Sequence, residues 1–91
     1  MKEQIKKLSL ELRDKYREEY KAWSKENPGK IMHGASIQVT AMEKTEFAES
    51  IEDLQAMKRC WEIEQRAQEG GINGFGFYVS AINELIKELT K

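Results

Sequence analysis

The chain has 91 residues, of which 34% are charged and 40% are hydrophobic, and its formal net charge is −1. This length predicts one domain over residues 1–91, with a modest core and little surplus stability. The high charge content favours a helical protein over a β-sandwich or barrel, and the aliphatic and aromatic content excludes a disordered chain. The near-neutral balance makes nucleic acid an unlikely partner, because nucleic-acid-binding domains are usually basic.

The cysteine and histidine content limits the chemistry of the chain. Cys60 is the single cysteine, so no intramolecular disulfide can form, and the charged first residues lack the apolar segment of a signal peptide. We therefore expect a cytoplasmic location. No apolar run approaches the ~18 residues of a membrane span, so no membrane partner is expected. One histidine, His33, and one cysteine do not form a ligand cluster, and we expect no metal and no other cofactor.

Charges are distributed unevenly along the sequence. Residues 1–30 contain nine Lys or Arg and six Asp or Glu, a net charge of +3, whereas residues 31–69 contain four and eight, a net charge of −4. The opposite signs predict that these two segments attract each other across a hairpin. The alternative is that the basic first segment meets an acidic partner or nucleic acid.

Residues 2–26 show the periodicity of an amphipathic helix. Apolar residues recur at spacings of three, four and seven, at Ile5, Leu8, Leu12, Tyr16 and Trp23. The sequence Asn27-Pro28-Gly29 should end this helix, since proline disfavours a helical residue before it and glycine accommodates the turn.

The next segment carries a weak strand signal. Residues 30–35 read as a loop, and residues 36–40 alternate polar residues with the β-branched apolar residues Ile37 and Val39. A single strand cannot stand alone, and the plausible partner is residues 74–79, where Phe75, Phe77 and Val79 also alternate. A two-stranded β-ribbon of 36–40 with 74–79 is therefore an alternative to a purely helical fold.

A long middle helix is expected over residues 41–69. Thr40 followed by Glu43 has the spacing of a capping box, and Gly70-Gly71 should end the helix. The segment has two apolar stripes, which predict that it packs between two neighbours. The bulky stripe contains Phe47, Ile51, Leu54, Met57 and Trp61, and the small one contains Ala56, Cys60, Ile63 and Ala67.

The last segment, about residues 76–90, predicts a third helix with a wide apolar arc. The arc contains Phe77, Tyr78, Val79, Ala81, Ile82, Leu85, Ile86 and Leu89. A helix that lies on a single surface needs an apolar arc of about 100°. Because the arc of this segment is wider, we expect the helix to be buried from more than one side, within the chain or in a homo-oligomer. The predicted fold is all-α, with a long antiparallel helical hairpin of 2–26 and 41–69 completed by this shorter helix.

A glycine-rich segment gives the sequence its strongest indication of a site. Four of the six glycines fall in residues 70–76, at Gly70, Gly71, Gly74 and Gly76, around Asn73 and Phe75 and just before Phe77. The favoured interpretation is a helix C-cap with a tight reversal. One alternative is a loop that contacts a partner protein through Phe75 and Phe77. Another is a cradle of backbone N–H groups for a phosphate or nucleotide, with charge added by Lys30, His33 and Arg66.

These observations predict a small non-enzymatic protein-interaction module, because no nucleophile–base pair, metal cluster or cofactor fingerprint is visible. Small cytoplasmic proteins of this kind are commonly regulators, adaptors or inhibitors, some of them encoded by phages or mobile elements. It would bind another protein, assemble with itself, or do both. The alternative is an oligomer that binds a small phosphorylated ligand through the glycine-rich residues 70–77.

Overall fold

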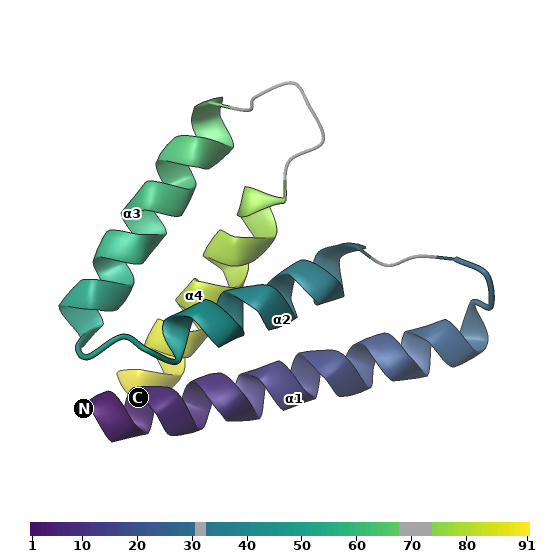
Figure 1. The fold of residues 1–91 in the computed structure, drawn as a ribbon, viewed down its shortest axis with the longest axis horizontal. Coiled ribbons are helices and arrows are strands. Elements are labelled where there is room, and N and C mark those ends of the chain that lie inside the picture. The colour runs from purple at the N-terminus through teal and green to yellow at the C-terminus, as the bar shows by residue number, and fades with distance from the viewer. Residues whose placement is uncertain (31–32, 68–73) are drawn as a thin grey trace.

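Four helices form the fold in the computed structural model, which describes residues 1–30, 33–67 and 74–91 (Figure 1). They are α1 (Lys2–Glu26), α2 (His33–Thr45), α3 (Ile51–Ala67) and α4 (Phe75–Leu89). The described residues contain no strand, and the predicted all-α class is confirmed.

The first helix has the predicted bounds, residues 2–26. Its apolar stripe faces the core, where Ile5, Leu12 and Tyr16 are buried. The helix ends at Asn27, and Gly29 adopts a φ of +80°, a left-handed conformation that glycine reaches without steric cost. The turn signal in the sequence therefore marks the real end of α1.

The predicted strand at 36–40 is wrong, and the predicted loop at 30–35 is wrong from residue 33 onward, because α2 occupies residues 33–45. Lys30 lies outside any helix, and residues 31 and 32 lie outside the described residues. Thr40 lies inside this helix, where its Oγ1 donates a hydrogen bond to the Ser36 carbonyl oxygen at 3.2 Å instead of capping a helix start. Helical packing outweighs the strand preference of Ile37 and Val39. The β-ribbon is wrong as well, since its second strand would fall on residues that form the start of α4.

The long helix predicted over 41–69 corresponds instead to the last residues of α2 and to α3, with a break at residues 46–50, and residues 68 and 69 lie outside the described residues. Ser50 Oγ accepts a hydrogen bond from the Asp53 backbone N–H at 3.2 Å, and an Asp53 carboxylate oxygen accepts one from the Glu49 N–H at 3.0 Å. These bonds satisfy backbone groups around the start of α3. A serine followed three residues later by an acid is a capping signal, so the sequence did carry the mark of this break.

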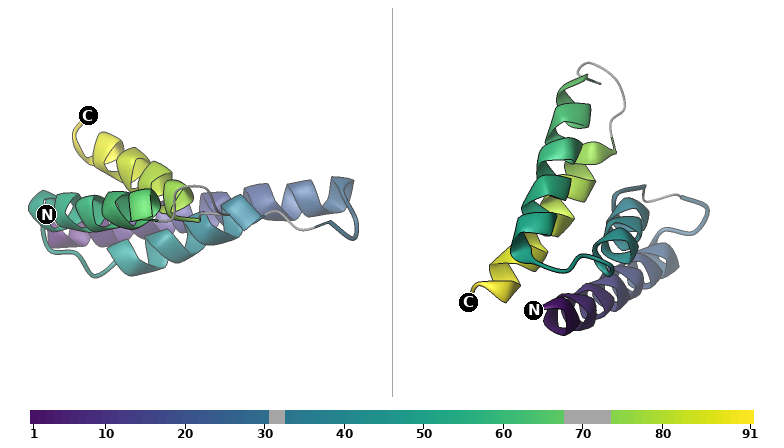
Figure 2. Two further views of the ribbon diagram at one scale, coloured as in Figure 1. Left: turned by 90° about the horizontal axis from the view of Figure 1, so that it is seen from above. Right: turned by 60° about the vertical axis from the view of Figure 1, so that its left-hand side comes forward.

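The helices pair as α1 with α2 and α3 with α4, and the right-hand view of Figure 2 shows the two pairs side by side. α4 also packs against α1 and α2, whereas α3 packs extensively with α4 alone. Ala81, Ile82 and Leu85 of α4 are fully buried, as expected for its wide apolar arc. They share one core cluster with other buried side chains, which are Ile5, Leu12, Tyr16, Ala41, Met42, Ala48 and Leu54.

Two small polar residues lie where α1 crosses α2. Ser9 and Thr45 are fully buried, and their hydroxyl oxygens are 2.9 Å apart. Thr45 Oγ1 also contacts the Met42 carbonyl oxygen at 3.1 Å as a donor, which leaves Ser9 to donate to Thr45. Each hydroxyl therefore has a partner, and the small side chains permit close approach of the two helices.

Two ion pairs join the basic first segment to the acidic segment after it, but the predicted antiparallel hairpin of 2–26 with 41–69 is wrong, because α1 pairs with α2 and α3 pairs with α4. Arg17 contacts Glu43 at 3.3 Å, and Lys2 contacts Glu49 at 3.5 Å. All four side chains are largely exposed, so each pair contributes little to stability.

A polar cluster joins α1 to α4. The Glu84 carboxylate accepts hydrogen bonds from Lys15 Nζ at 2.9 Å and from the Tyr16 hydroxyl at 2.8 Å. The hydrogen bond from Lys15 lowers the pKa of Glu84 below its ordinary value the most, and the hydrogen bond from Tyr16 lowers it further. Burial and the bond to Glu84 raise the pKa of Tyr16, and the same carboxylate raises the pKa of Lys15. The cluster therefore favours an ionised Glu84 beside a neutral Tyr16 and a charged Lys15.

Replacing Ser9 by Leu should lower the free energy of unfolding by about 1–3 kcal/mol, because no space for a larger side chain remains between α1 and α2. Ser9→Ala should cost less than about 1 kcal/mol, since Thr45 keeps its bond to a carbonyl oxygen. The exposed Ser80→Leu is the matched control, with an expected change within about 0.5 kcal/mol. Urea denaturation measures all three; equal values for Ser9→Leu and Ser80→Leu would contradict the tight crossing.

Replacing Glu84 by Gln should lower the free energy of unfolding by about 1 kcal/mol at neutral pH, a modest value because the carboxylate is partly exposed. The folded-state pKa of Glu84 lies below its unfolded value of about 4.3, so this stabilisation is full above that value. It is lost as the pH falls through the lowered folded-state pKa. Denaturation at several pH values measures it, with the exposed Glu3→Gln as control. A parent–variant difference that stays constant into acid would contradict the role of Glu84.

Candidate functional site

Glycines bring the start of α4 against the start of α2. A Cβ atom at Gly34 would lie 2.6 Å from Phe77 Cε1, with two more ring atoms at 3.0 Å. A Cβ atom at Gly74, which precedes α4, would lie 2.8 Å from Ile37 Cδ1. Both distances are shorter than ordinary carbon contacts, so a side chain at Gly34 would require the Phe77 ring to move, and one at Gly74 would require the flexible end of Ile37 to shift.

The same end of α4 packs on α3. A Cβ atom at Gly76 would lie 3.2 Å from Gln65 Nε2. The next turn carries Tyr78, whose ring stacks on Trp61 of α3 with 5.0 Å between ring centroids and contacts Phe75 at 5.5 Å. Aromatic pairs at these separations stabilise beyond the area they bury. The glycine–aromatic junction, residues 74–78, thus holds together α2, α3 and α4.

The sequence-predicted site residues are only partly assembled by the fold. Gly74 and Phe77 lie beside the first turns of α2, which begins at His33, whereas Gly76 lies beside Gln65 of α3. Arg66 is in the last turn of α3 and Lys30 precedes α2; both are exposed, and among the described residues no hydrogen bond or ion pair joins either to 74–77. Gly70, Gly71 and Asn73 lie outside the described residues.

The two interpretations of the glycine-rich segment can be compared at its described positions. Side chains of the protein fill the space beside Gly74 and Gly76, so helix packing accounts for these two glycines. Phe75 packs on Tyr78, whereas Phe77 is 43% exposed and could contact a partner. A phosphate cradle would depend mainly on Gly70, Gly71 and Asn73 and stays a prediction.

Apart from Met1 at the start of the chain, the other large apolar side chains exposed among the described residues lie on α3 and on the segment before it. Ile63 is 61% exposed and Phe47 is 77% exposed, so the expectation that Phe47 belongs to the buried bulky stripe is wrong. Leu54, Met57 and Trp61 of that stripe do pack in the core. The second stripe of α3 is exposed at all four positions, namely Ala56, Cys60, Ile63 and Ala67. Of the two neighbours predicted for this helix, the described chain therefore supplies one, α4.

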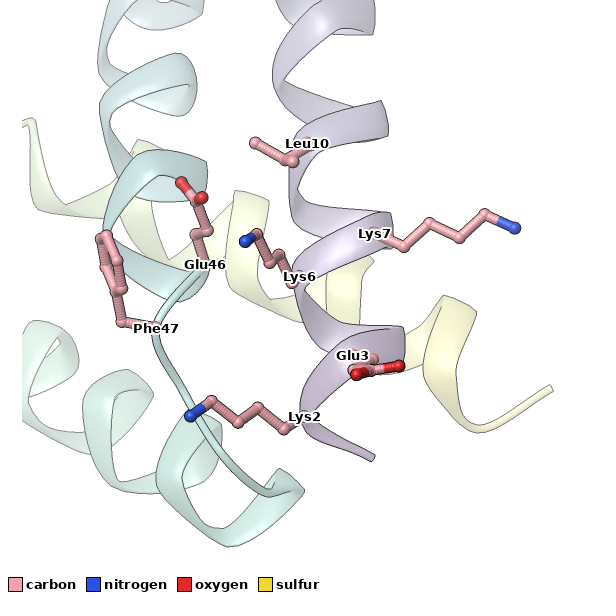
Figure 3. A pocket seen from close by; sticks show the side chains of 7 residues that line it. All are labelled: Lys2, Glu3, Lys6, Lys7, Leu10, Glu46 and Phe47. Carbon is pink, nitrogen blue, oxygen red and sulfur yellow. The ribbon is translucent and has the colours of Figure 1, made fainter.

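Phe47 and Leu10 border an open groove between α1 and the end of α2 (Figure 3). The groove has a volume of about 710 Å³, and its remaining lining residues are charged: Lys2, Glu3, Lys6, Lys7 and Glu46. In Figure 3 the Lys6 side chain extends between Leu10 and Phe47 toward Glu46. This open groove, flanked by flexible lysines of α1, lacks the convergent polar groups that orient a small substrate.

Within the described residues, no group of three or more His, Cys, Asp or Glu side chains could hold a metal ion. None of the described helices combines the length and the apolar character that a bilayer crossing requires. None of the protein-family models, curated proteins or solved structures compared with the chain matches it. Its site therefore has to be argued from its own geometry.

A double-mutant cycle tests the close approach at Gly34. In the parent chain, Gly34→Ala should lower the free energy of unfolding by about 1 kcal/mol, because the Phe77 ring must move away from the new methyl group. In a Phe77→Ala background the same change should raise it by up to about 1 kcal/mol, since alanine favours the helix. Thermal or urea denaturation of the four proteins gives the coupling energy. An identical effect of Gly34→Ala in both backgrounds would show that the ring does not limit this position.

Proposed function

We propose that the chain is a small, non-enzymatic protein-interaction module that acts in the cytoplasm by binding another protein, by assembling with itself, or by both. The observation that carries this proposal is the exposed apolar face of α3. Among the described helices, α4 is the one extensive neighbour of α3, and the opposite side of α3 presents Ile63 between small residues to solvent.

The size of the chain adds weight to that observation. A domain of 91 residues has a limited supply of apolar side chains for its core, so leaving large ones exposed reduces its stability. Ile63, Phe47 and Phe77 are nevertheless exposed by 61%, 77% and 43%. A contiguous exposed apolar patch commonly marks a protein-interaction site, and Ile63 lies in such a patch with Cys60 and Ala67 on one face of α3. Binding a partner at this face would bury Ile63 and stabilise the folded chain.

Within this class, a regulator, adaptor or inhibitor is the role that fits a small chain with an exposed helical face. The alternative, an oligomer that binds a phosphorylated ligand, rests on the glycine-rich residues 70–77. The packing at Gly74 and Gly76 gives it no added support.

Affinity purification of the tagged chain from the cells that produce it tests the proposal, next to a Phe47→Ser/Ile63→Ser variant. Both side chains are mostly exposed, so the variant should keep its helical circular-dichroism spectrum and lose the proteins that the parent retains. A Glu26→Gln variant, altered at an exposed site at the far end of α1, should retain them. A parent chain that is strictly monomeric and retains no protein above background would contradict the proposal.

A further inference from the structure

We infer that the exposed face of α3 binds α3 of a second copy of this chain, with the two helices parallel. This inference rests on the proposed function and names the partner of the same surface. Figure 1 shows α3 at one side of the molecule, with α4 along one flank of the helix.

The exposed residues of α3 follow a heptad pattern. Ala56, Cys60, Ile63 and Ala67 are separated by four, three and four residues, the spacing of the d, a, d and a positions of a coiled coil. All four are exposed in the single chain. A seam of this kind needs a helix with the same spacing opposite it, and a second α3 provides one.

The charges beside the seam are self-complementary. Arg59 precedes the a residue Cys60 and is therefore a g position, whereas Glu64 follows the d residue Ile63 and is an e position, at the opposite edge of the face. The ion pair within α3 joins Lys58 to Glu62. Both Arg59 and Glu64 are exposed and lack an ion-pair partner among the described residues.

Parallel pairing gives both charges a partner. In a parallel two-stranded coiled coil, a g residue of one helix contacts the e residue five positions later in the other. Arg59 of each copy would then face Glu64 of the second copy, and the two-fold symmetry makes this pair twice. A partner with a uniformly acidic or basic surface would instead leave one of the two residues beside a like charge.

Antiparallel pairing suits these residues less well. Residues of the same edge then meet. When the two stripes overlap fully, with Cys60 beside Ile63 of the second copy, Arg59 would lie near Arg66 of the second copy, a like charge. Glu64 would lie near Met57 of the second copy and would gain no cation. The parallel arrangement also places the two Cys60 side chains beside each other across the symmetry axis.

The expected dimer is weak. Two helices of 17 residues with small seam residues bury less than the ~1,200 Å² of a stable interface. We therefore expect a dimer that forms and dissociates with protein concentration.

Charge-reversal variants test the pairing by sedimentation velocity over a concentration series. Arg59→Glu and Glu64→Arg should each weaken dimerisation about tenfold or more, because each places like charges opposite each other twice. The double variant R59E/E64R restores both pairs and should recover the parent Kd within about threefold. Lys7→Glu on α1 is the matched control, since it changes the net charge as much as R59E does and lies away from α3.

Cross-linking through Cys60 gives a second measurement of the same contact. With diamide as the oxidant, two Cys60 thiols lose two electrons and two protons to diamide and form one disulfide. The linked dimer should appear in the parent and in R59E/E64R, and it should be strongly reduced in R59E.

Three outcomes would overturn the inference: single reversals that leave the Kd unchanged, a double variant that dimerises no better than the single ones, or a parent that stays monomeric at every concentration. If the parent is monomeric but captures other proteins, and the Phe47→Ser/Ile63→Ser variant does not capture them, then the inferred pairing with a second copy is wrong and the proposed function stands. A monomeric parent that captures nothing would contradict both.

Discussion

The structure depends on the burial of α4, which is the one described helix that packs against each of the other three. Its fully buried residues Ala81, Ile82 and Leu85 fill the space between the α1–α2 pair and α3. Without them α3 would lose its one extensive neighbour and the core would divide. The glycines around the start of α4 favour the same packing, because a side chain at Gly74 or Gly76 would require Ile37 of α2 or Gln65 of α3 to shift. The bonds from Tyr16 and Lys15 to Glu84 then fix α4 against α1.

The sequence predictions are most accurate where the signal lies within one segment of the chain, and least accurate where contacts between distant segments decide the structure. α1 was predicted to the residue because its periodicity is long and a proline–glycine turn ends it. The position of α4 and its burial on several sides followed from the width of its apolar arc. The segment 33–40 was predicted wrongly, because the alternation at Ile37 and Val39 is a weak preference that contacts with α1 and α4 override. The break before α3 was not predicted, because the apolar pattern of the sequence continues across it. Ser50 and Asp53 nevertheless have the spacing of a helix cap.

The candidate site was predictable in part. Glycines at 74 and 76 did indicate a close approach, but the surfaces that approach could not be known before α2 was recognised as a helix. The buried Ser9–Thr45 pair and the Glu84 cluster join residues 36 and 68 or more positions apart, and no sequence pattern marks such pairs. The second stripe of α3 was visible in the sequence. In the structure no other part of the described chain covers this stripe, so the stripe is a candidate interface and not part of the core.

Hydrogen–deuterium exchange, followed by helix in a dilute and a concentrated sample, tests the central claim most directly. The claim is that α4 is the buried centre of the fold and that α3 has one neighbour within the chain and a second in another copy. We expect the amides around Ala81–Leu85 to exchange slowest in both samples, and those of α3 to exchange faster in the dilute sample and to slow markedly on concentration. Amides of α3 that are as protected as those of α4 in the dilute sample, with no change on concentration, would contradict the account.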